Sequence, residues 1–142
     1  MNADLIRAQQ VLAAEGCTCV LCKGDIFYKS THRGVAPLLG WLEEGLDTKC
    51  FSAADKVVGK ATAFLYCLLG ITAVHANVIS EAAIAVLQQQ GICVSFGQRV
   101  PAIQNRKGDG LCPMELATRD VTDPADAPAA IRAALARLTD SR

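Results

Sequence analysis

The amino-acid sequence predicts one α/β domain, a three-layer α/β/α sandwich around a mixed, mainly parallel sheet of five strands. Short apolar runs typical of buried strands alternate with longer segments of helical spacing. Strands separated by helices pair in parallel, and such sheets are covered on both faces. A chain of 142 residues has the usual size of one domain, so residues 1–142 are assigned to a single domain.

The first half of the chain is expected to contain three helices and a hairpin. Apolar residues at helical spacing predict a helix over 3–14 and another over 35–44. Two short β-type runs around residues 23–25 predict a hairpin. The longest helix is expected from Ser52 to Gly70. Asp55 lies three residues after Ser52, which is the spacing of a capping box at a helix start.

The second half supplies the remaining strands. A buried strand over 71–78 is expected to lead into a helix over 80–90, followed by a strand over 92–96. A turn at 97–98 is expected to reverse the chain into an edge strand over 100–103. Next, Pro113 opens a short helix, and an amphipathic helix through Ile131, Leu135 and Leu138 ends the chain.

Composition and charge exclude several classes of function. The chain has 14 basic and 14 acidic residues, and the basic ones are scattered, so no positive field attracts nucleic acid. No apolar run reaches about 18 residues and the N-terminus does not resemble a signal peptide, so no membrane partner and a cytoplasmic location are expected. Seven cysteines, an odd number at uneven spacing, favour reduced thiols over a disulfide framework.

Two phrases of the sequence carry a resemblance to a known family. SAADKVVGKA at residues 52–61 and GDGLCPMELA at residues 108–117, together with the order of the elements, resemble a bacterial family catalogued as domain of unknown function 1893. The similarity runs over nearly all of the chain. It implies a cytidine-deaminase-like fold, but it implies no activity, because that family has no settled function.

The resemblance also shows which deaminase motifs are missing. Working deaminases of this fold take a zinc ligand and a catalytic Glu from H-x-E or C-x-E at one core helix start, and two cysteines from P-C-x-x-C at the next. The resemblance places these helix starts at residues 52–56 and 79–83, and neither contains such a motif. Cys112 is a single cysteine on a later helix. No metal and no cofactor are therefore expected, and zinc-dependent deamination is rejected.

Two lysines near the start of the expected long helix suggest an anion-binding site. Lys56 and Lys60 are four residues apart, so on a helix they share one face and repel each other. Both lie near the positive end of a helix whose later turns are apolar and buried. A phosphate or carboxylate held by both lysines, next to Asp55, would relieve the repulsion. In the alternative interpretation Asp55 only completes the cap, and the lysines reach solvent or pair with acidic residues.

A basic loop and the short helix after it form the second candidate region. Arg106 and Lys107 could cover a phosphate-bearing ligand, and Glu115 either binds that ligand or completes the cap of the helix. A thiol at a helix start has its thiolate favoured, so Cys112 is a candidate nucleophile, with His32 or His75 as the base. The structural alternative is a capping or buried thiol.

Other residues have simpler interpretations beside the functional ones. Ser80 and Glu81 either cap the helix that follows the 71–78 strand or face Asp55 across a groove at the end of that strand. His75 is interpreted as a core histidine. The C-x-x-C cysteines at 19 and 22 are interpreted as buried strand residues.

Three functions follow from these candidates. The first is a binding module that holds a nucleotide-like or phosphorylated small molecule with the lysines and the basic loop. The second is a metal-free enzyme with Cys112 as nucleophile, or with Lys56, whose amine would lose its proton more easily beside a second cation. The third is an interaction protein that forms a homodimer through apolar surface.

Overall fold

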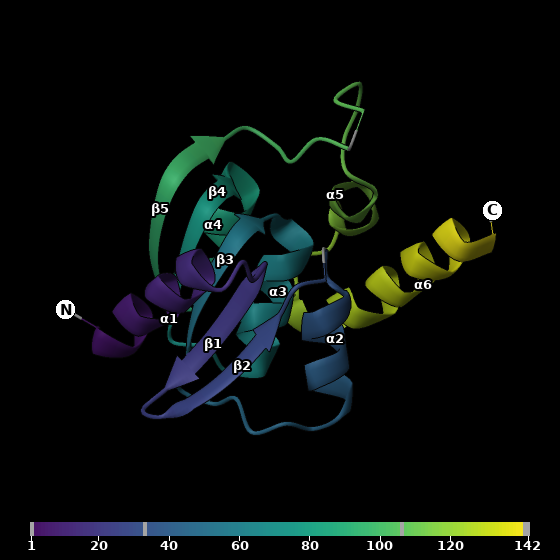
Figure 1. Ribbon diagram of the computed structural model, residues 1–142. Coiled ribbons are helices and arrows are strands. Elements are labelled where there is room, and N and C mark those ends of the chain that lie inside the picture. Colours follow the sequence, from purple (N-terminus) through teal and green to yellow (C-terminus); the bar gives the residue numbers. More distant parts are fainter. Residues whose placement is uncertain (1, 33, 106, 141–142) are drawn as a thin grey trace.

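A computed structural model describes residues 2–32, 34–105 and 107–140. Its helices and strands follow one another along the chain (Figure 1): α1 (Ala3–Ala14), β1 (Cys19–Lys23), β2 (Ile26–Ser30), α2 (Ala36–Glu43), β3 (Ser52–Val58), α3 (Lys60–Leu69), β4 (Ala73–Ser80), α4 (Glu81–Gln89), β5 (Cys93–Val100), α5 (Pro113–Thr118), a short 3-10 helix (Pro124–Asp126) and α6 (Ala127–Asp140).

The described strands form one mixed five-stranded sheet, as predicted, but only two of its four pairings are parallel, so the sheet is not mainly parallel. Their order is β2-β1-β3-β4-β5. Strand β1 is antiparallel to both of its neighbours, whereas β3, β4 and β5 run parallel to one another. Helix α3 connects β3 to β4, and α4 connects β4 to β5. The chain is therefore of the α/β class.

The elements with strong local signals lie where the sequence predicts them. The side chain of Asn2 caps α1 by accepting from the amide of Leu5 at 3.1 Å. The β1–β2 hairpin turns at Gly24 and Asp25, since Lys23 pairs with Ile26. Gly24 has a φ of 59°, a left-handed conformation that glycine adopts without the steric cost other residues carry.

The helix expected from Ser52 is wrong, because residues 52–58 form strand β3. This strand lies between β1 and β4, and its first residues are buried against both faces of the sheet. A fully buried strand shows no alternation of apolar and polar residues, and its alanines resemble a helical pattern. Helix α3 begins only at Lys60, so Lys56 and Lys60 are not one helical turn apart.

The turn expected at residues 97–98 is also wrong. Strand β5 continues through this point to Val100, and Gln98 pairs with Val78 of β4. Gly97 has a different role, since a Cβ atom there would lie 3.0 Å from the carbonyl oxygen of Asn77. The glycine thus permits the close approach of β4 and β5. The edge strand expected over 100–103 does not form, because residues 101–103 are not in a strand.

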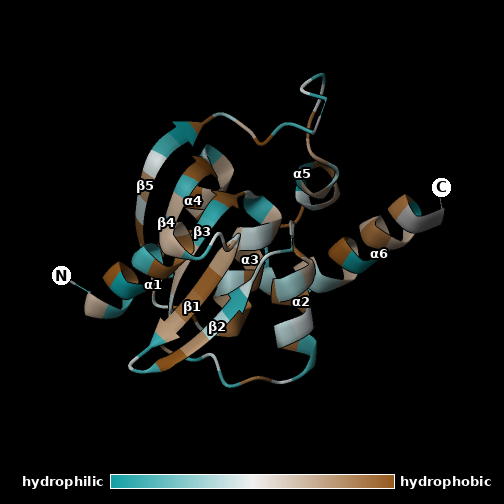
Figure 2. Ribbon diagram, in the orientation of Figure 1, coloured by the Kyte–Doolittle hydropathy of each residue, from teal (hydrophilic) through white to brown (hydrophobic). Residues whose placement is uncertain are grey.

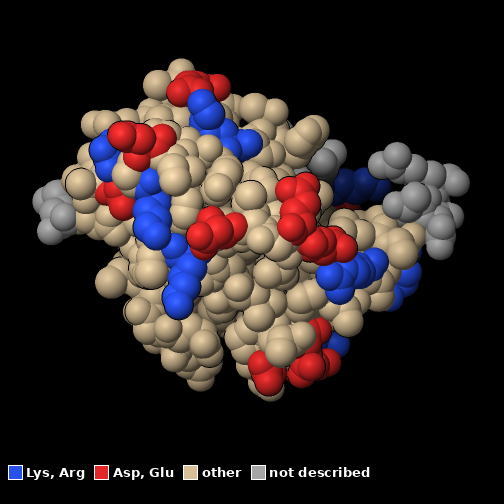
Figure 3. Space-filling view, turned by 90° about the horizontal axis from the view of Figure 1, so that it is seen from below, with Lys and Arg blue, Asp and Glu red and all other residues tan. Residues whose placement is uncertain are grey.

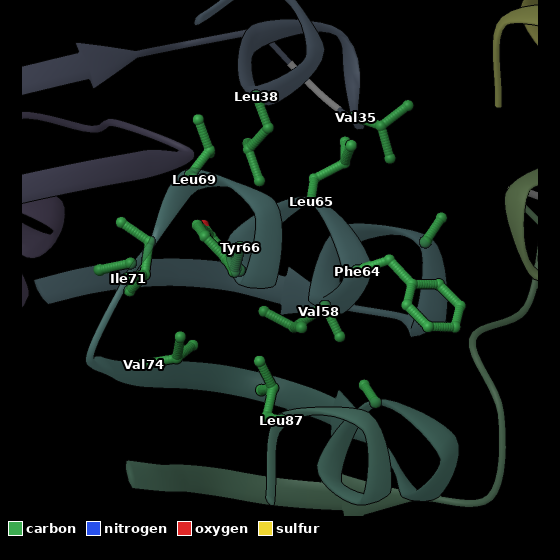
Figure 4. Close-up of a cluster of buried hydrophobic side chains, with 14 of the residues drawn as sticks. Val35, Leu38, Val58, Phe64, Leu65, Tyr66, Leu69, Ile71, Val74 and Leu87 are labelled. Atoms are coloured by element: carbon green, nitrogen blue, oxygen red, sulfur yellow. The ribbon is translucent and has the colours of Figure 1, made fainter. Parts of the chain in front are cut away.

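Helices lie on both faces of the sheet and bury different residues. On one face, here called the α1 face, Ala8 and Leu12 of α1 pack against Val20 and Ala54. On the other, called the α3 face, α2, α3 and α4 build the larger cluster around Tyr66 (Figure 4). Helix α6 contacts α3 and α5, and its C-terminal part extends away from the sheet (Figure 1).

Strand β5 is the exposed edge of the sheet. Six of its eight residues are exposed, and Phe96 keeps 41% of its surface in solvent. Hydrophilic residues mark the end of this strand, whereas β1 is largely hydrophobic (Figure 2).

All seven cysteines are free, and Cys19 and Cys22 are buried on β1, as their interpretation as strand residues requires. In the described part of the chain, no helix has the length and apolar character needed to span a bilayer.

Candidate functional site

The residues of the expected anion site are divided between the two faces of the sheet. Neighbouring residues on a strand point to opposite faces. Asp55 points to the α3 face, where it is 7% exposed and accepts from the hydroxyl of Tyr66 at 2.6 Å. Lys56 is exposed and lines a cavity on the α1 face. Asp55 and Lys56 therefore do not contribute to one site.

The start of α3 is already occupied by a carboxylate of the chain itself. The amide of Lys60 donates to Oε1 of Glu115 at 2.6 Å, and Glu115 is buried. The ammonium of Lys60 donates to the carbonyl of Arg119 at 2.8 Å and lies 5.7 Å from the centre of the Phe64 ring. Lys60 and Glu115 thus come together, but in a contact between α3 and α5.

The start of α4 is capped in the ordinary way. Ser80 is fully buried, and its hydroxyl accepts from the amide of Ala83 at 3.2 Å, which confirms the capping interpretation. Glu81 is exposed and lies 4.0 Å from Nε of Arg99. Because β3 and β4 are neighbours, the starts of α3 and α4 lie at the same edge of the sheet.

The second candidate region offers no assembled nucleophile. Cys112 precedes α5 and is half-buried, and its thiol makes no capping hydrogen bond. Helix α5 packs on α3, whereas His75 lies on the α1 face, so the fold places this histidine and Cys112 on opposite sides of the sheet. Lys107 is exposed, and Arg106 lies outside the described residues.

A buried polar cluster links Asp55, Tyr66 and Cys19. The Tyr66 hydroxyl lies 2.6 Å from Asp55 Oδ2 and 3.1 Å from the thiol of Cys19. Burial raises the pKa of Asp55 from 3.8 to about 6, against the lowering effect of the hydrogen bond from Tyr66. Burial also raises the pKa of Cys19 and of Tyr66 well above their ordinary values. These groups are closed off from solvent, and they hold α3 on the sheet.

A polar cavity of about 190 Å³ lies on the α1 face, between α1 and the sheet. Lys56 of β3 and His75 and Asn77 of β4 form its sheet side. Lys56 and Asn77 lie between the register pairs Asp55–Ala76 and Val57–Val78, and the two-residue spacing puts His75 and Asn77 on one face. The side of the cavity formed by α1 and the residues after it consists of Gln9, Leu12, Ala13 and Gly16.

The cavity contains one cation among neutral polar groups. Burial lowers the pKa of His75 below its ordinary value of 6.5, so its imidazole is neutral at neutral pH. Nδ1 of this ring lies 2.8 Å from the hydroxyl of Ser95 on β5. Lys56 adds an ammonium, and Gln9 and Asn77 add amides that both donate and accept. The expectation that His75 is a core residue is corrected, because it is half-buried at the wall of a cavity.

A larger hollow of about 270 Å³ lies between α5 and α6. Its lining is mostly apolar, with Arg137 as the one charged residue among those that line it. The polar cavity on the α1 face is the better candidate site, because several groups that recognise ligands converge there.

The sequence profile of the family described as a domain of unknown function (DUF1893) matches residues 7–135. The chain belongs to this family. A crystal structure of a DUF1893 family protein from Thermotoga maritima is similar to it, with a TM-score of 0.85 and 22% identity over 94% of this chain and 91% of that chain. At this identity the likeness shows a common fold. No curated protein sequence shows significant similarity to the chain.

In this DUF1893 protein, charge is mixed on the one face that Figure 3 shows. On the face seen in Figure 3, basic and acidic side chains lie among one another, so this face has no large area of one sign. Within the described ranges, no three His, Cys, Asp or Glu side chains are grouped so that they could hold a metal ion. What the described residues do assemble is the donor-rich cavity on the α1 face.

Proposed function

We propose that this chain is a deaminase-like binding protein for a small phosphorylated or nucleotide-like molecule, whose anionic group lies in the cavity on the α1 face. The observation that carries the proposal is the convergence of Lys56, His75 and Asn77 with Gln9 in one cavity. An ammonium supplies the charge that attracts an oxyanion, and the neighbouring neutral groups supply donors to its oxygens.

The size of the cavity restricts how much of a ligand it encloses. Its volume of about 190 Å³ is below the roughly 300–1,000 Å³ of typical small-molecule sites. The cavity therefore encloses the phosphate-bearing end of the ligand. The rest of a nucleotide-like molecule would extend along β5, the exposed strand beside β4.

The relation to cytidine deaminases is part of the proposal. Helices α3 and α4 follow neighbouring parallel strands, an arrangement that supports the resemblance. The corrected start of α3, residues 59–62, again contains no His, Cys or Glu. Glu115 and Ile103 pack against Gly59, at the point where the resemblance implies a catalytic pocket. Ligand binding at the α1 face does not depend on that pocket.

The two alternative functions are not equally supported. A nucleophilic Lys56 would need Lys60 as a second cation beside it, but the two lysines lie on different elements, and Lys60 is bound to the Arg119 carbonyl. A nucleophilic Cys112 still requires a base. The homodimer stays a prediction, and exposed apolar residues such as Val57 and Phe96 supply surface for it.

A ligand panel with matched lysine variants tests the proposal. Sugar phosphates and nucleoside monophosphates at high excess are expected to raise the unfolding temperature of the wild type. A ligand at ten times its Kd stabilises by about 1.4 kcal/mol. The Lys56→Gln variant is expected to lose this response, and because Lys56 is exposed, its fold is retained.

Two further variants make the thermal test specific. Lys49→Gln removes an exposed charge elsewhere and is expected to respond as the wild type does. Lys60→Gln removes the ammonium at the start of α3 and tests whether the anion binds there instead. If no compound stabilises the wild type, or if Lys60→Gln abolishes the response while Lys56→Gln keeps it, the proposal is wrong.

A further inference from the structure

Ser95 lies next to the cavity without forming part of its lining. It stands beside His75 in the register of the neighbouring strands β4 and β5, and its hydroxyl lies 2.8 Å from Nδ1 of that histidine. Ser95 is exposed. Its hydroxyl contacts the one ring in the cavity whose hydrogen-bonding role depends on where its proton is placed.

A neutral imidazole has one nitrogen that donates and one that accepts. The hydrogen bond made by one nitrogen decides the role of the other. The basic nitrogen of a neutral imidazole is a better acceptor than a hydroxyl oxygen, so the favoured arrangement has the Ser95 hydroxyl donating to Nδ1. The proton of the ring is then on Nε2.

We propose that Ser95 is a positioning residue, which holds His75 in the tautomer with hydrogen on Nε2 so that this N–H donates to a ligand oxygen. The inference rests on the proposed function of the cavity. Through Ser95, the edge strand β5 would take part in recognition, although the side chain of Ser95 does not itself contact the ligand.

This tautomer determines which chemical group fits beside His75. With Nε2 as a donor, the cavity offers an ammonium, an imidazole N–H and amide N–H groups to the ligand. Such a set matches a phosphate group, whose oxygens accept hydrogen bonds. The other tautomer would offer an acceptor at Nε2 and would match a hydroxyl of a sugar. The cavity is therefore assigned to the phosphate end of the ligand.

Nitrogen NMR of the imidazole side chains tests this inference without requiring a ligand. The chain has two histidines, and the exposed His32 serves as an internal reference. At pH 7.5 we expect the His75 spectrum of the wild type to show protonated Nε2 and unprotonated Nδ1. Ser95→Ala is expected to shift the ring toward a mixture of tautomers, and Ser95→Thr, which keeps the hydroxyl, to restore the wild-type pattern.

Binding of inorganic phosphate provides the second measurement. Ser95→Ala is expected to weaken it about fivefold, the effect of loosening one ordinary hydrogen bond. The His75 Nε2 signal of the wild type is expected to move on titration. A protonated Nδ1 in the wild type, or His75 spectra unchanged by Ser95→Ala, would overturn the inference.

The two proposals fail in different ways. If Lys56→Gln abolishes phosphate binding and Ser95→Ala changes neither the tautomer nor the affinity, the positioning role is wrong and the binding function stands. If phosphate moves no signal of the wild type although the tautomer depends on Ser95, the binding function is wrong, and the assignment of Nε2–H to a ligand fails with it.

Discussion

Replacing Tyr66 with phenylalanine is expected to destabilise the protein by about 3 kcal/mol at pH 8 and by clearly less at pH 5. The hydroxyl of Tyr66 donates to Oδ2 of Asp55 at 2.6 Å, deep in the protein. Without it, an ionised Asp55 loses its strongest partner in a site that is closed to water. At pH 5 the carboxyl is mostly protonated, because its pKa is about 6, and a neutral group tolerates the loss better.

The same cluster makes stability depend on pH in a defined direction. The folded pKa of Asp55 is raised from 3.8 to about 6, so the folded state binds this proton more tightly than the unfolded state does. Its contribution to stability is complete below about pH 4 and is lost as pH rises through 6. The full shift corresponds to about 3 kcal/mol, most of which is lost between pH 4 and pH 8.

Urea unfolding from pH 4 to pH 8 measures both effects. Asp55→Asn is expected to remove this loss of stability with rising pH, because an amide has no charge to bury. Tyr28→Phe is the matched control, since Tyr28 lies half-buried against Phe51 and is expected to show a small effect at every pH. If Asp55→Asn and the wild type give parallel curves across this range, the buried cluster does not titrate as described.

Replacing Gly59 with alanine is expected to destabilise the protein by about 2–3 kcal/mol. The backbone at Gly59 is extended, with φ −98° and ψ −177°, so alanine itself is not strained there. The added Cβ would collide with Oε1 of Glu115 and would lie 3.2 Å from Cγ1 of Ile103. Glu115 would then lose its hydrogen bond to the amide of Lys60 and leave the start of α3 without its acceptor.

A double-mutant cycle separates the collision from other causes. In a Glu115→Ala background the side chain that collides with the new Cβ is absent. Gly59→Ala is therefore expected to cost at least about 1 kcal/mol less there than in the wild type, a coupling energy typical of residues in contact. Urea unfolding of the four proteins gives the coupling energy. Equal costs of Gly59→Ala in both backgrounds would show that a collision with Glu115 is not what destabilises the variant.

Local signals were sufficient for part of the fold. The glycine turn of the hairpin and the serine before α4 are signals contained within a few residues of the chain, so the sequence predicts them directly. The strand at residues 52–58 has no such signal. It is a strand because β1 and β4 pair with both of its edges, and those partners come from distant parts of the chain.

The candidate site was predictable only in part for the same reason. Lys56 was selected as a binding residue, but its helical assignment gave it Lys60 as a partner in place of Asn77. Gln9 and Asn77 were missed, because they meet only when α1 packs on the sheet and β3 lies beside β4. The two-residue spacing of His75 and Asn77 on a strand was the one signal available in the sequence.

Phosphate titration followed by the backbone amide signals tests the position of the site most directly. The cavity on the α1 face predicts that the largest shifts cluster at Gly16, Lys56 and Asn77, and that they disappear in Lys56→Gln. Shifts that cluster at the amides of Lys60 and Glu81, at the starts of α3 and α4, would contradict this account and return the site to the helix ends.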